Sequence, residues 1–515
     1  MKTNNIIKTI LIPAAMGTLF ASCSLDYEPL SQASELTQGS YKDSTTLVLK
    51  DKAAAEAQLQ TLLKIPHDRQ EHRHLDLILV GDVTADNAYG GSLDGGVVDF
   101  ENNSMDVDNA NLERDWNRYL EDIGKCNVLI IGSKQLYDKG SLTESEYNNY
   151  RSQGELCRAL QMFPMVRIFG GIPIITTIGP TITSENIDSV WKDYYPARNT
   201  IEECYDQIVK DLEDAAKYAP DFNPSDRTLL TKPVAYAFLA KAYAEMASLY
   251  PDKKTEYYNK VIEAAEKVRK TQGIDLEPEF KTLWGFDEST QDCVKRNTSE
   301  GILEAQWVKG GGNWESWMFT KPLDNPTEQW TWAKWITPSR DLIKFYEDEG
   351  DTERFNQTVV FYPCEWSLYY PANNYPFMHK LRAKVCNEYV CRLADIILLE
   401  AEAYAYTGNL AKSAELVNMI RQRAKLKDLT ADQTSSQKNM IDAVLKERRL
   451  ELALEGERWF DLKRNGKVEE VMNGIDKRDS GRHTQVRPFS KDSYLMPIPQ
   501  TAIDQNDNLV QNPGY

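Results

Sequence analysis

The chain has 515 residues, of which 41% are apolar, so it can bury a sizeable core without support from disulfides. Its formal net charge of −18 argues against nucleic acid and other polyanions as partners, because these require a basic surface. Neutral glycans, peptides and weakly charged oligomers remain as candidate ligands.

The first 22 residues have the pattern of a secretory signal peptide. Lys2 and Lys8 give a basic start, and residues 6–20 form an apolar stretch. Proline and glycine interrupt this stretch, which is too short for a bilayer-spanning helix of about 20 residues. No later stretch is apolar enough over such a length either. We therefore predict that residues 1–22 are removed on export.

Cys23 directly follows two small residues, Ala21 and Ser22. A cysteine in this position is typical of bacterial lipoproteins, in which it becomes the first residue and carries acyl chains such as palmitate on its sulfur and amino group. Two such signals hold a protein on a membrane. The alternative is an ordinary signal peptide with an incidental cysteine, and we favour the lipoprotein. Residues 23–45, which are polar and turn-prone, then form a tether.

The other cysteines and the histidines do not predict a metal centre. Seven cysteines follow Cys23, and none has the paired spacing of a zinc site. His67, His72 and His74 lie in a charged segment that we interpret as a solvated turn. The Asp- and Asn-rich residues 82–111 could hold calcium but lack EF-hand spacing. We expect no cofactor, and the sequence leaves disulfide pairing open.

Residues 46–515 are predicted to form one mainly helical domain. Apolar residues recur three and four apart over much of residues 112–272 and 390–465, which we expect to form a helical scaffold. Two helix pairs there, at 232–271 and 391–426, put small residues beside bulky ones and turn once over about 34 residues, as tetratricopeptide units do. Such units stack and offer an extended surface to a partner. A generic helical hairpin is the alternative.

Residues 82–111 and 284–385 are expected to form a loop-rich, aromatic-rich lobe inserted into this scaffold. Residues 82–111 have no steady period and predict a long surface loop, a kind of segment that often carries function. Eight of the eleven tryptophans lie within the second segment, among glycines and prolines. Exposed aromatic faces beside amide and carboxylate groups suit sugars, because the rings stack and the polar groups bond hydroxyls.

One acidic pattern could suggest catalysis. Glu447, Glu451 and Glu455 step by four along a predicted helix, with Arg448 and other arginines expected within reach. Glycoside hydrolysis needs two carboxylates about 5 to 9.5 Å apart. We favour a salt-bridge network that holds the helix on the scaffold. The sequence also lacks a nucleophile elbow, a phosphate loop and a dinucleotide fingerprint, so we expect no enzyme.

Several separated segments resemble the SusD/RagB family and occur in the family's order over nearly the whole chain. They are ELCRALQMFPMVRIFGGIPIIT, EGILEAQW, ADIILLEAEAYAYTGN, KERRLELALEGERWFDLKRNG and YLMPIPQTAIDQNDNLVQNPGY. The resemblance implies a tetratricopeptide-like scaffold of the SusD-like kind. It also implies a binding protein that caps a SusC-like TonB-dependent transporter in the outer membrane and delivers glycans or peptides to it.

The resemblance also implies where a ligand would bind. In starch-binding relatives, an arc of aromatic side chains from an early loop and from the later lobe contacts the sugar. Tyr89 lies where the early part of that arc would fall, and the glycine-flanked tryptophans of the lobe are candidates for the later part. The expected ligand-binding residues are Asp86, Asn87, Tyr89, Asn313, Trp314, Trp317 and Trp330.

The sequence therefore allows three candidate functions. The first is a lipid-anchored protein on the outer face of the outer membrane that captures oligosaccharide for a TonB-dependent transporter. The second is the same architecture with a peptide ligand. The third, a secreted glycoside hydrolase, is disfavoured because no carboxylate pair with a clear role lies in the aromatic lobe.

Replacing Cys23 by alanine removes the only side chain expected to carry lipid. We predict that Cys23→Ala releases the protein from membranes, because attachment then lacks both acyl signals. Fractionation of cells that express the variant, beside cells that express the unchanged chain, checks this outcome. A variant that stays in the detergent-soluble outer-membrane fraction would show that the lipoprotein interpretation is wrong.

Overall fold

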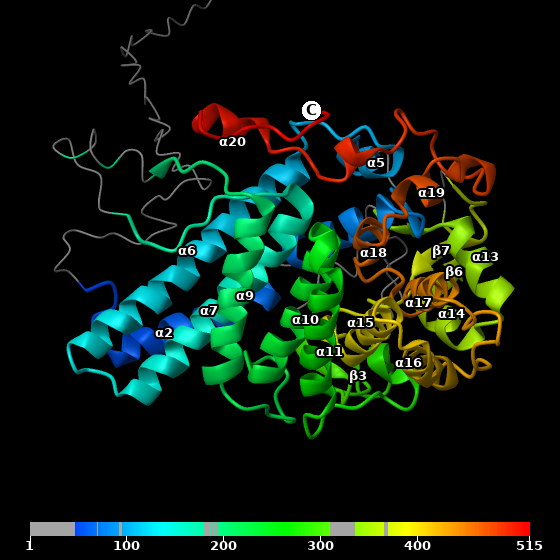
Figure 1. The fold of residues 1–515 in the computed structure, drawn as a ribbon. Helices are drawn as coiled ribbons and strands as arrows, with labels where there is room; N and C mark the ends of the chain where they lie inside the picture. The colour runs from blue at the N-terminus through cyan, green and yellow to red at the C-terminus, as the bar shows by residue number, and fades with distance from the viewer. Residues whose placement is uncertain are drawn as a thin grey trace, which may run out of the picture.

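Helices form most of the computed structural model, as the fold class predicted (Figure 1). No helix in the part of the chain that is described is both long and apolar enough to cross a membrane. The predicted signal peptide and tether lie outside that part. The structure describes residues 47–68, 71–91, 95–179, 186, 190, 194–308, 335–364 and 369–515.

The long helices lie side by side, and each packs against the next along the chain. The pair α10–α11 packs through α11 on α15, so the two predicted helix pairs are neighbours although a long segment separates them in sequence. This stack is consistent with the tetratricopeptide-like scaffold. In order, its helices are α6 (Ala110–Asp138), α7 (Glu144–Phe169), α9 (Ile201–Tyr218), α10 (Lys232–Leu249), α11 (Lys254–Arg269), α15 (Leu393–Tyr406), α16 (Leu410–Arg423) and α17 (Gln437–Leu452).

Local sequence sets the ends of these helices. Thr143 and Glu146 form a capping box at the start of α7, and Thr200 and Glu203 form another at the start of α9. Gly170 ends α7 with a φ of 79°, which an L side chain would rarely adopt.

Short helical elements surround the stack. Those before it are α2 (Lys52–Leu63), α3 (Ile65–Asp68), η1 (Glu71–Leu75), α4 (Asp76–Ile78), η2 (Leu79–Val83) and α5 (Gly95–Asn102). The short element η3 (Pro251–Lys253) connects α10 to α11, and η4 (Phe280–Trp284), α13 (Arg340–Glu349) and α14 (Thr352–Thr358) lie between α11 and α15. Those after α17 are α18 (Arg458–Arg464), α19 (Val468–Met472), η5 (Ile475–Lys477), η6 (Lys491–Ser493) and α20 (Gln500–Gln505).

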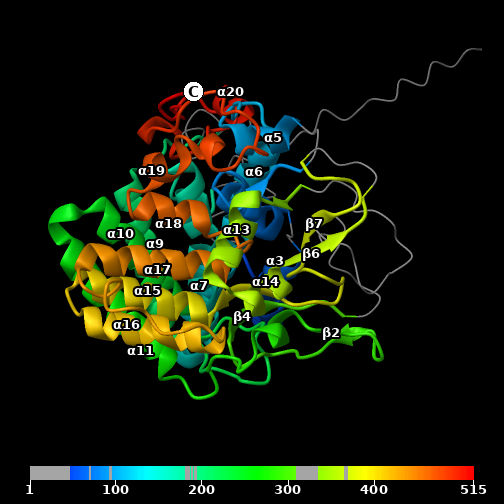
Figure 2. The ribbon, with the colours of Figure 1, turned by 90° about the vertical axis from the view of Figure 1, so that its right-hand side faces the viewer.

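The strands of the described residues form antiparallel pairs, two strands to a sheet. Figure 2 shows β6 and β7 on the side of the molecule away from α10 and α11. The pair β1–β5 is the one that joins the early segment to the inserted lobe. The pairs are β1 (Ala88–Tyr89) with β5 (Thr337–Pro338), β2 (Phe286–Asp287) with β3 (Asp292–Cys293), β4 (Gly301–Ala305) with β8 (Glu388–Arg392), and β6 (Val359–Tyr362) with β7 (Tyr375–Met378).

The prediction of a long surface loop over 82–111 is wrong. This segment begins in η2, contains the buried strand β1 and the helix α5, and enters α6 at Ala110. Contacts of Asp82 explain why this polar segment is buried. The Asp82 carboxylate accepts hydrogen bonds from the backbone N–H groups of Leu454 at 3.1 Å and Gly456 at 2.7 Å. These donors come from the other end of the chain, so no local pattern signals them.

Two glycines make this approach possible. A Cβ on Gly81 would lie 2.1 Å from the carbonyl oxygen of Gly456, a distance that no side chain can occupy. Gly456 itself has a φ of 82°. The early segment and the turn after α17 are therefore in backbone contact, which only glycine permits.

The interpretation of the histidine segment as a solvated turn is also wrong. His72, Arg73 and His74 are buried in the π-helical element η1. The Nε2 of His72 is 3.4 Å from Asp122, and the Nδ1 of His74 is 2.8 Å from Glu388. Buried charged groups require such partners, and both carboxylates lie far away in sequence.

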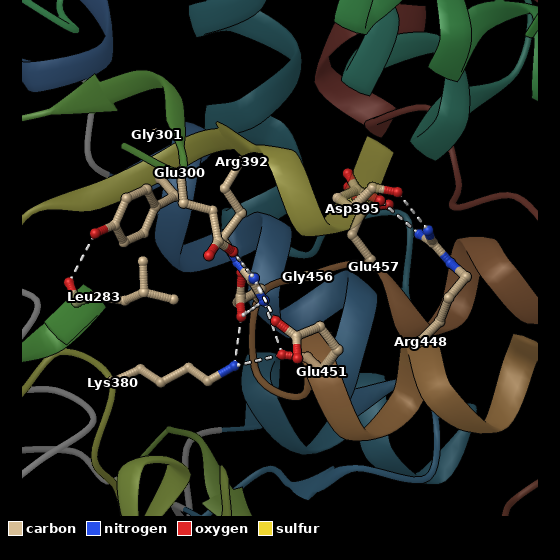
Figure 3. Close-up of polar contacts among 12 residues, drawn as sticks. Leu283, Glu300, Gly301, Lys380, Arg392, Asp395, Arg448, Glu451, Gly456 and Glu457 are labelled. Carbon is tan, nitrogen blue, oxygen red and sulfur yellow. Dashed lines mark hydrogen bonds and ion pairs between the residues drawn. The ribbon is translucent and has the colours of Figure 1, made fainter. Parts of the chain in front are cut away.

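The acidic face of α17 is a buried ion network, as the salt-bridge interpretation predicted. Arg392 lies at its centre and donates to Glu451 at 2.6 Å and to Glu300 at 2.7 Å (Figure 3). It also bonds Glu455 through Nε at 2.7 Å. Arg423 and Arg354 contact Glu451 as well. Each carboxylate is thus held by cations, and none is free to act on a substrate.

The arginines that lie next to these glutamates in sequence have other partners, contrary to expectation. Arg448 and Arg449 directly follow Glu447 along α17, and adjacent residues of a helix do not face each other. Figure 3 shows Arg448 reaching Asp395 instead. The partners are Asp395 and Asp461 for Arg448, Asp341 for Arg449, and Asp86 for Arg458.

Replacing Glu451 by glutamine leaves buried arginines without a shared counter-charge. We expect Glu451→Gln to lower the free energy of unfolding by about 3–5 kcal/mol, as breaking a buried pair does. Urea unfolding followed by circular dichroism at pH 7 measures this. The control is Glu415→Gln, because Glu415 is exposed and its pair with Lys412 contributes at most about 1 kcal/mol. Equal losses in both variants would contradict the network's role.

The same network predicts a pH dependence. Burial raises the pKa of Glu451, but Arg423, Arg392 and Arg354 outweigh burial and hold the pKa well below its usual range. The stabilisation is therefore fully present above the ordinary glutamate pKa and is lost as the pH falls towards the depressed one. The difference between Glu451→Gln and the unchanged protein should shrink accordingly below pH 4.5.

Candidate functional site

Aromatic rings form a continuous row across the inserted lobe. Tyr89 stacks on Tyr369 with ring centroids 4.6 Å apart and planes at 8°, and it lies 6.1 Å from Tyr370. Tyr370 lies 5.8 Å from Tyr375, and Tyr375 lies 5.2 Å from Phe377. We name this the aromatic row; its members are Tyr89, Tyr362, Tyr369, Tyr370, Tyr375 and Phe377.

Two strand pairs position the row. Tyr89 lies on β1, opposite Thr337 of β5, while Tyr362 and Tyr375 face each other in the register of β6 and β7. The hydroxyls of Thr337 and Tyr375 lie 2.6 Å apart, which connects the two strand pairs. The row therefore rests on hydrogen-bonded backbone rather than on a single loop.

Polar groups fix the inner rings. The hydroxyl of Tyr89 donates to Asp479 at 2.5 Å and accepts the backbone N–H of Arg340 at 2.9 Å. Burial, followed by the charge of Asp479, raises the pKa of Tyr89, which keeps its hydroxyl protonated. The hydroxyl of Tyr369 donates to Glu101 at 2.6 Å. These rings are thus locked in place.

Two rings of the row, which we call the outer rings, are more exposed than Tyr89 and Tyr369. Tyr362 and Tyr370 are half-buried, and the neighbouring Phe361 keeps 36% of its surface exposed. The guanidinium of Arg340 lies 4.2 Å from the centre of the Tyr370 ring. Partly exposed rings on a rigid base, with a cation over one of them, can contact a sugar and bond its hydroxyls.

The early residues predicted to bind ligand do not form an exposed platform. Asp86, Asn87 and Tyr89 are 1%, 0% and 0% exposed. The Asp86 carboxylate bonds Arg458 at 2.8 Å, and the Asn87 side chain accepts from Arg449 at 2.9 Å. Burial raises the pKa of Asp86, but the neighbouring arginines outweigh burial and hold it below its usual range. Both side chains therefore hold the early segment against the end of α17 and the residues that follow it.

The later residues predicted to bind ligand, Asn313, Trp314, Trp317 and Trp330, lie outside the described residues. Trp307, a tryptophan of the same lobe that is described, is 1% exposed and belongs to the interior. Arg340 and Tyr362 belong to no motif or periodic pattern of the sequence, so neither could be predicted as part of a site. The doublet Tyr369–Tyr370, directly before Pro371, was a signal of an aromatic turn in the lobe.

No group of three or more histidine, cysteine, aspartate or glutamate side chains within the described ranges could hold a metal ion. Cys126, Cys157 and Cys204 are buried in helices, as expected for small apolar side chains.

Solved structures share this fold. One is a SusD superfamily protein from Parabacteroides distasonis, with a TM-score of 0.72 and 21% identity over 90% of this chain and 99% of that one. Another is a surface glycan-binding protein A from Bacteroides fluxus, with a TM-score of 0.71 and 20% identity over 90% and 99%. A third is a laminarin-binding SusD-like protein, with a TM-score of 0.68 and 20% identity over 90% and 100%.

Sequence comparisons agree with the fold. Residues 370–515 match the SusD family, and residues 37–244 match a family described as starch-binding associating with outer membrane. SusD-like protein P2 of Formosa agariphila is 25% identical over 86% of this chain and 88% of its own length. A SusD-like protein of Bacteroides ovatus is 24% identical over 88% and 81%. The matched segments lie at both ends of the scaffold, so the chain belongs to the SusD-like family.

Proposed function

We propose that this protein is a lipid-anchored glycan-binding protein of the outer cell surface, which captures oligosaccharide and passes it to a TonB-dependent transporter. The observation that carries the proposal is the aromatic row, a set of packed rings of which Tyr362 and Tyr370 are partly exposed. Family membership supports it, as do two proteins of the same fold whose names specify laminarin and surface glycans.

The ligand surface is proposed to consist of the outer end of the row together with the tryptophans of residues 309–334. Half-buried Tyr362 and Tyr370 offer ring faces, and Arg340 offers hydrogen-bond donors beside them. Because the inner rings are locked by Asp479 and Glu101, a sugar would meet a preformed platform and would lose little affinity to ordering it.

Tyr89 supports this platform from below. Its ring is fully buried, so truncating it would cost stability on the order of 3–5 kcal/mol and would not report on ligand contact alone. Tyr370 is the better probe, since it is half-buried and adjacent to Tyr89 in the row.

Truncating an outer platform ring should weaken glycan binding without unfolding the protein. We expect Tyr370→Ala, Trp314→Ala and Trp317→Ala each to lower affinity about tenfold, since one stacking contact contributes roughly 1 kcal/mol or more. Titration calorimetry with laminarin and with starch measures affinity, and a melting curve for each variant measures stability. Tyr147→Ala is the control, because its ring stacks on Tyr137 in the helical scaffold.

Three outcomes would contradict the glycan proposal. Stable variants that bind as tightly as the unchanged protein would place the ligand elsewhere. Binding of a tryptic peptide mixture, but of neither glycan, would favour the peptide ligand. Release of sugar products on incubation with either glycan would show a hydrolase.

Delivery requires a partner, which we propose to be a SusC-like TonB-dependent barrel. Mild-detergent extraction through an affinity tag at the C-terminus is expected to recover the barrel with this protein. We expect the two to share an interface well above the roughly 1,600 Å² of standard complexes. Repeated recovery of a monomer alone, with ligand present, would contradict the proposed partner. The Cys23→Ala form, extracted in parallel, separates barrel contact from membrane co-extraction.

A further inference from the structure

A partly open cavity of about 90 Å³ lies between the helical scaffold and the inserted lobe, apart from the aromatic row. Helices α7 and α10 line one side of it, and η1, η4, β7 and β8 line the others. Leu77, Tyr389, Val390 and Glu455 are the half-buried residues of its lining, so the cavity comes nearest to solvent there.

Most charged side chains that line the cavity are paired with one another. Lys380 contacts Glu455, and His74 lies 2.8 Å from Glu388. Arg167 and Lys241 share Glu457, at 2.6 and 2.8 Å. These two cations have further carboxylate partners behind the lining, which are Glu245 for Arg167 and Asp395 for Lys241.

Arg73 differs from these cations. Its side chain lines the cavity and the residue is only 7% exposed, yet no carboxylate of the described residues lies within ion-pair distance of it. Its Nη1 donates to the carbonyl oxygen of Leu160 at 2.6 Å and to Gln161 at 3.3 Å. Its buried Nε has no hydrogen-bond partner, and Nη2 donates to none of the described groups.

This arrangement leaves one edge of a guanidinium unsatisfied. Nε and Nη2 form the edge that binds a carboxylate through two parallel hydrogen bonds. A buried cation without a counter-charge is costly, and an anion in the cavity would remove that cost.

The remaining walls restrict the kind of anion. They are largely apolar and include Phe163, Phe238, Met378 and Leu381, which suit a short hydrocarbon group better than a second charge. An engineered apolar cavity of about 150 Å³ holds benzene, so roughly 90 Å³ suits a molecule of about four heavy atoms. We propose that this cavity binds a small monocarboxylate such as acetate, with its carboxylate against the guanidinium of Arg73 at Nη2 and its alkyl group against the apolar wall.

The test uses the mature chain and sodium acetate as the probe. Acetate should raise the melting temperature in a saturable way, because a ligand that binds only the folded state stabilises it. Sodium chloride and sodium sulfate at the same ionic strength should not reproduce the rise. Arg73→Gln should weaken acetate binding at least tenfold, given the usual strength of charge-assisted hydrogen bonds.

Arg118→Gln is the matched control, since Arg118 is a more exposed arginine paired only within its own helix, with Glu121. It should keep the response to acetate. An equal response to chloride or sulfate, or unchanged acetate binding by Arg73→Gln, would overturn the proposal.

If Arg73→Gln does not fold, acetate binding can still be tested with the unchanged protein. The NMR signal of ¹³C-labelled acetate should broaden with the protein and sharpen again when an excess of unlabelled acetate competes. Broadening that chloride reverses equally, or no saturable broadening, would overturn the site.

Discussion

Each carboxylate that α17 carries into the interior must meet a cation there, because an isolated buried charge costs several kcal/mol. Glu451 meets that requirement through Arg392, which ends strand β8 and precedes α15. Glu455, just beyond the end of α17, contacts Arg392 as well. Glu300, next to β4, bonds the same guanidinium. One ion network therefore fixes the last scaffold helix, the start of the second helix pair and the central strand pair in a single geometry.

Hydrogen bonds from the end of α17 and the residues after it also hold the lobe on the scaffold. Arg449 and Arg458, at and beyond the end of α17, hold Asn87 and Asp86, and the chain then passes directly into β1 with Tyr89. The rings of the aromatic row are thus connected to the scaffold by charge-assisted hydrogen bonds over a few residues. A platform supported in this way presents its outer faces in one orientation, which favours recognition of a rigid ligand.

The sequence predicted what depends on local patterns. Helices of the scaffold and the stacking of repeats follow from periodicity within each segment, and the glutamate face of α17 was recognised as a salt-bridge network. It could not predict that Asp86 and His74 are buried, because their partners Arg458 and Glu388 lie hundreds of residues away. A polar segment with distant counter-charges has the same composition as a solvated loop. The stacking of Tyr369 on Tyr89 could not be predicted either, because it depends on which strands pair.

The joint between the two ends of the chain also constrains the order of folding. Tyr89 and Asp479, which share a hydrogen bond, are separated by 390 residues. Arg482 donates to the carbonyl oxygen of Val83, and these two residues are 399 apart. Helix pairs of the scaffold need only local contacts and can form early, whereas such long-range contacts form late and slowly. The buried acids of the early segment therefore stay without counter-charges until the final segment is available. The aromatic row is therefore completed last, when Asp479 reaches Tyr89.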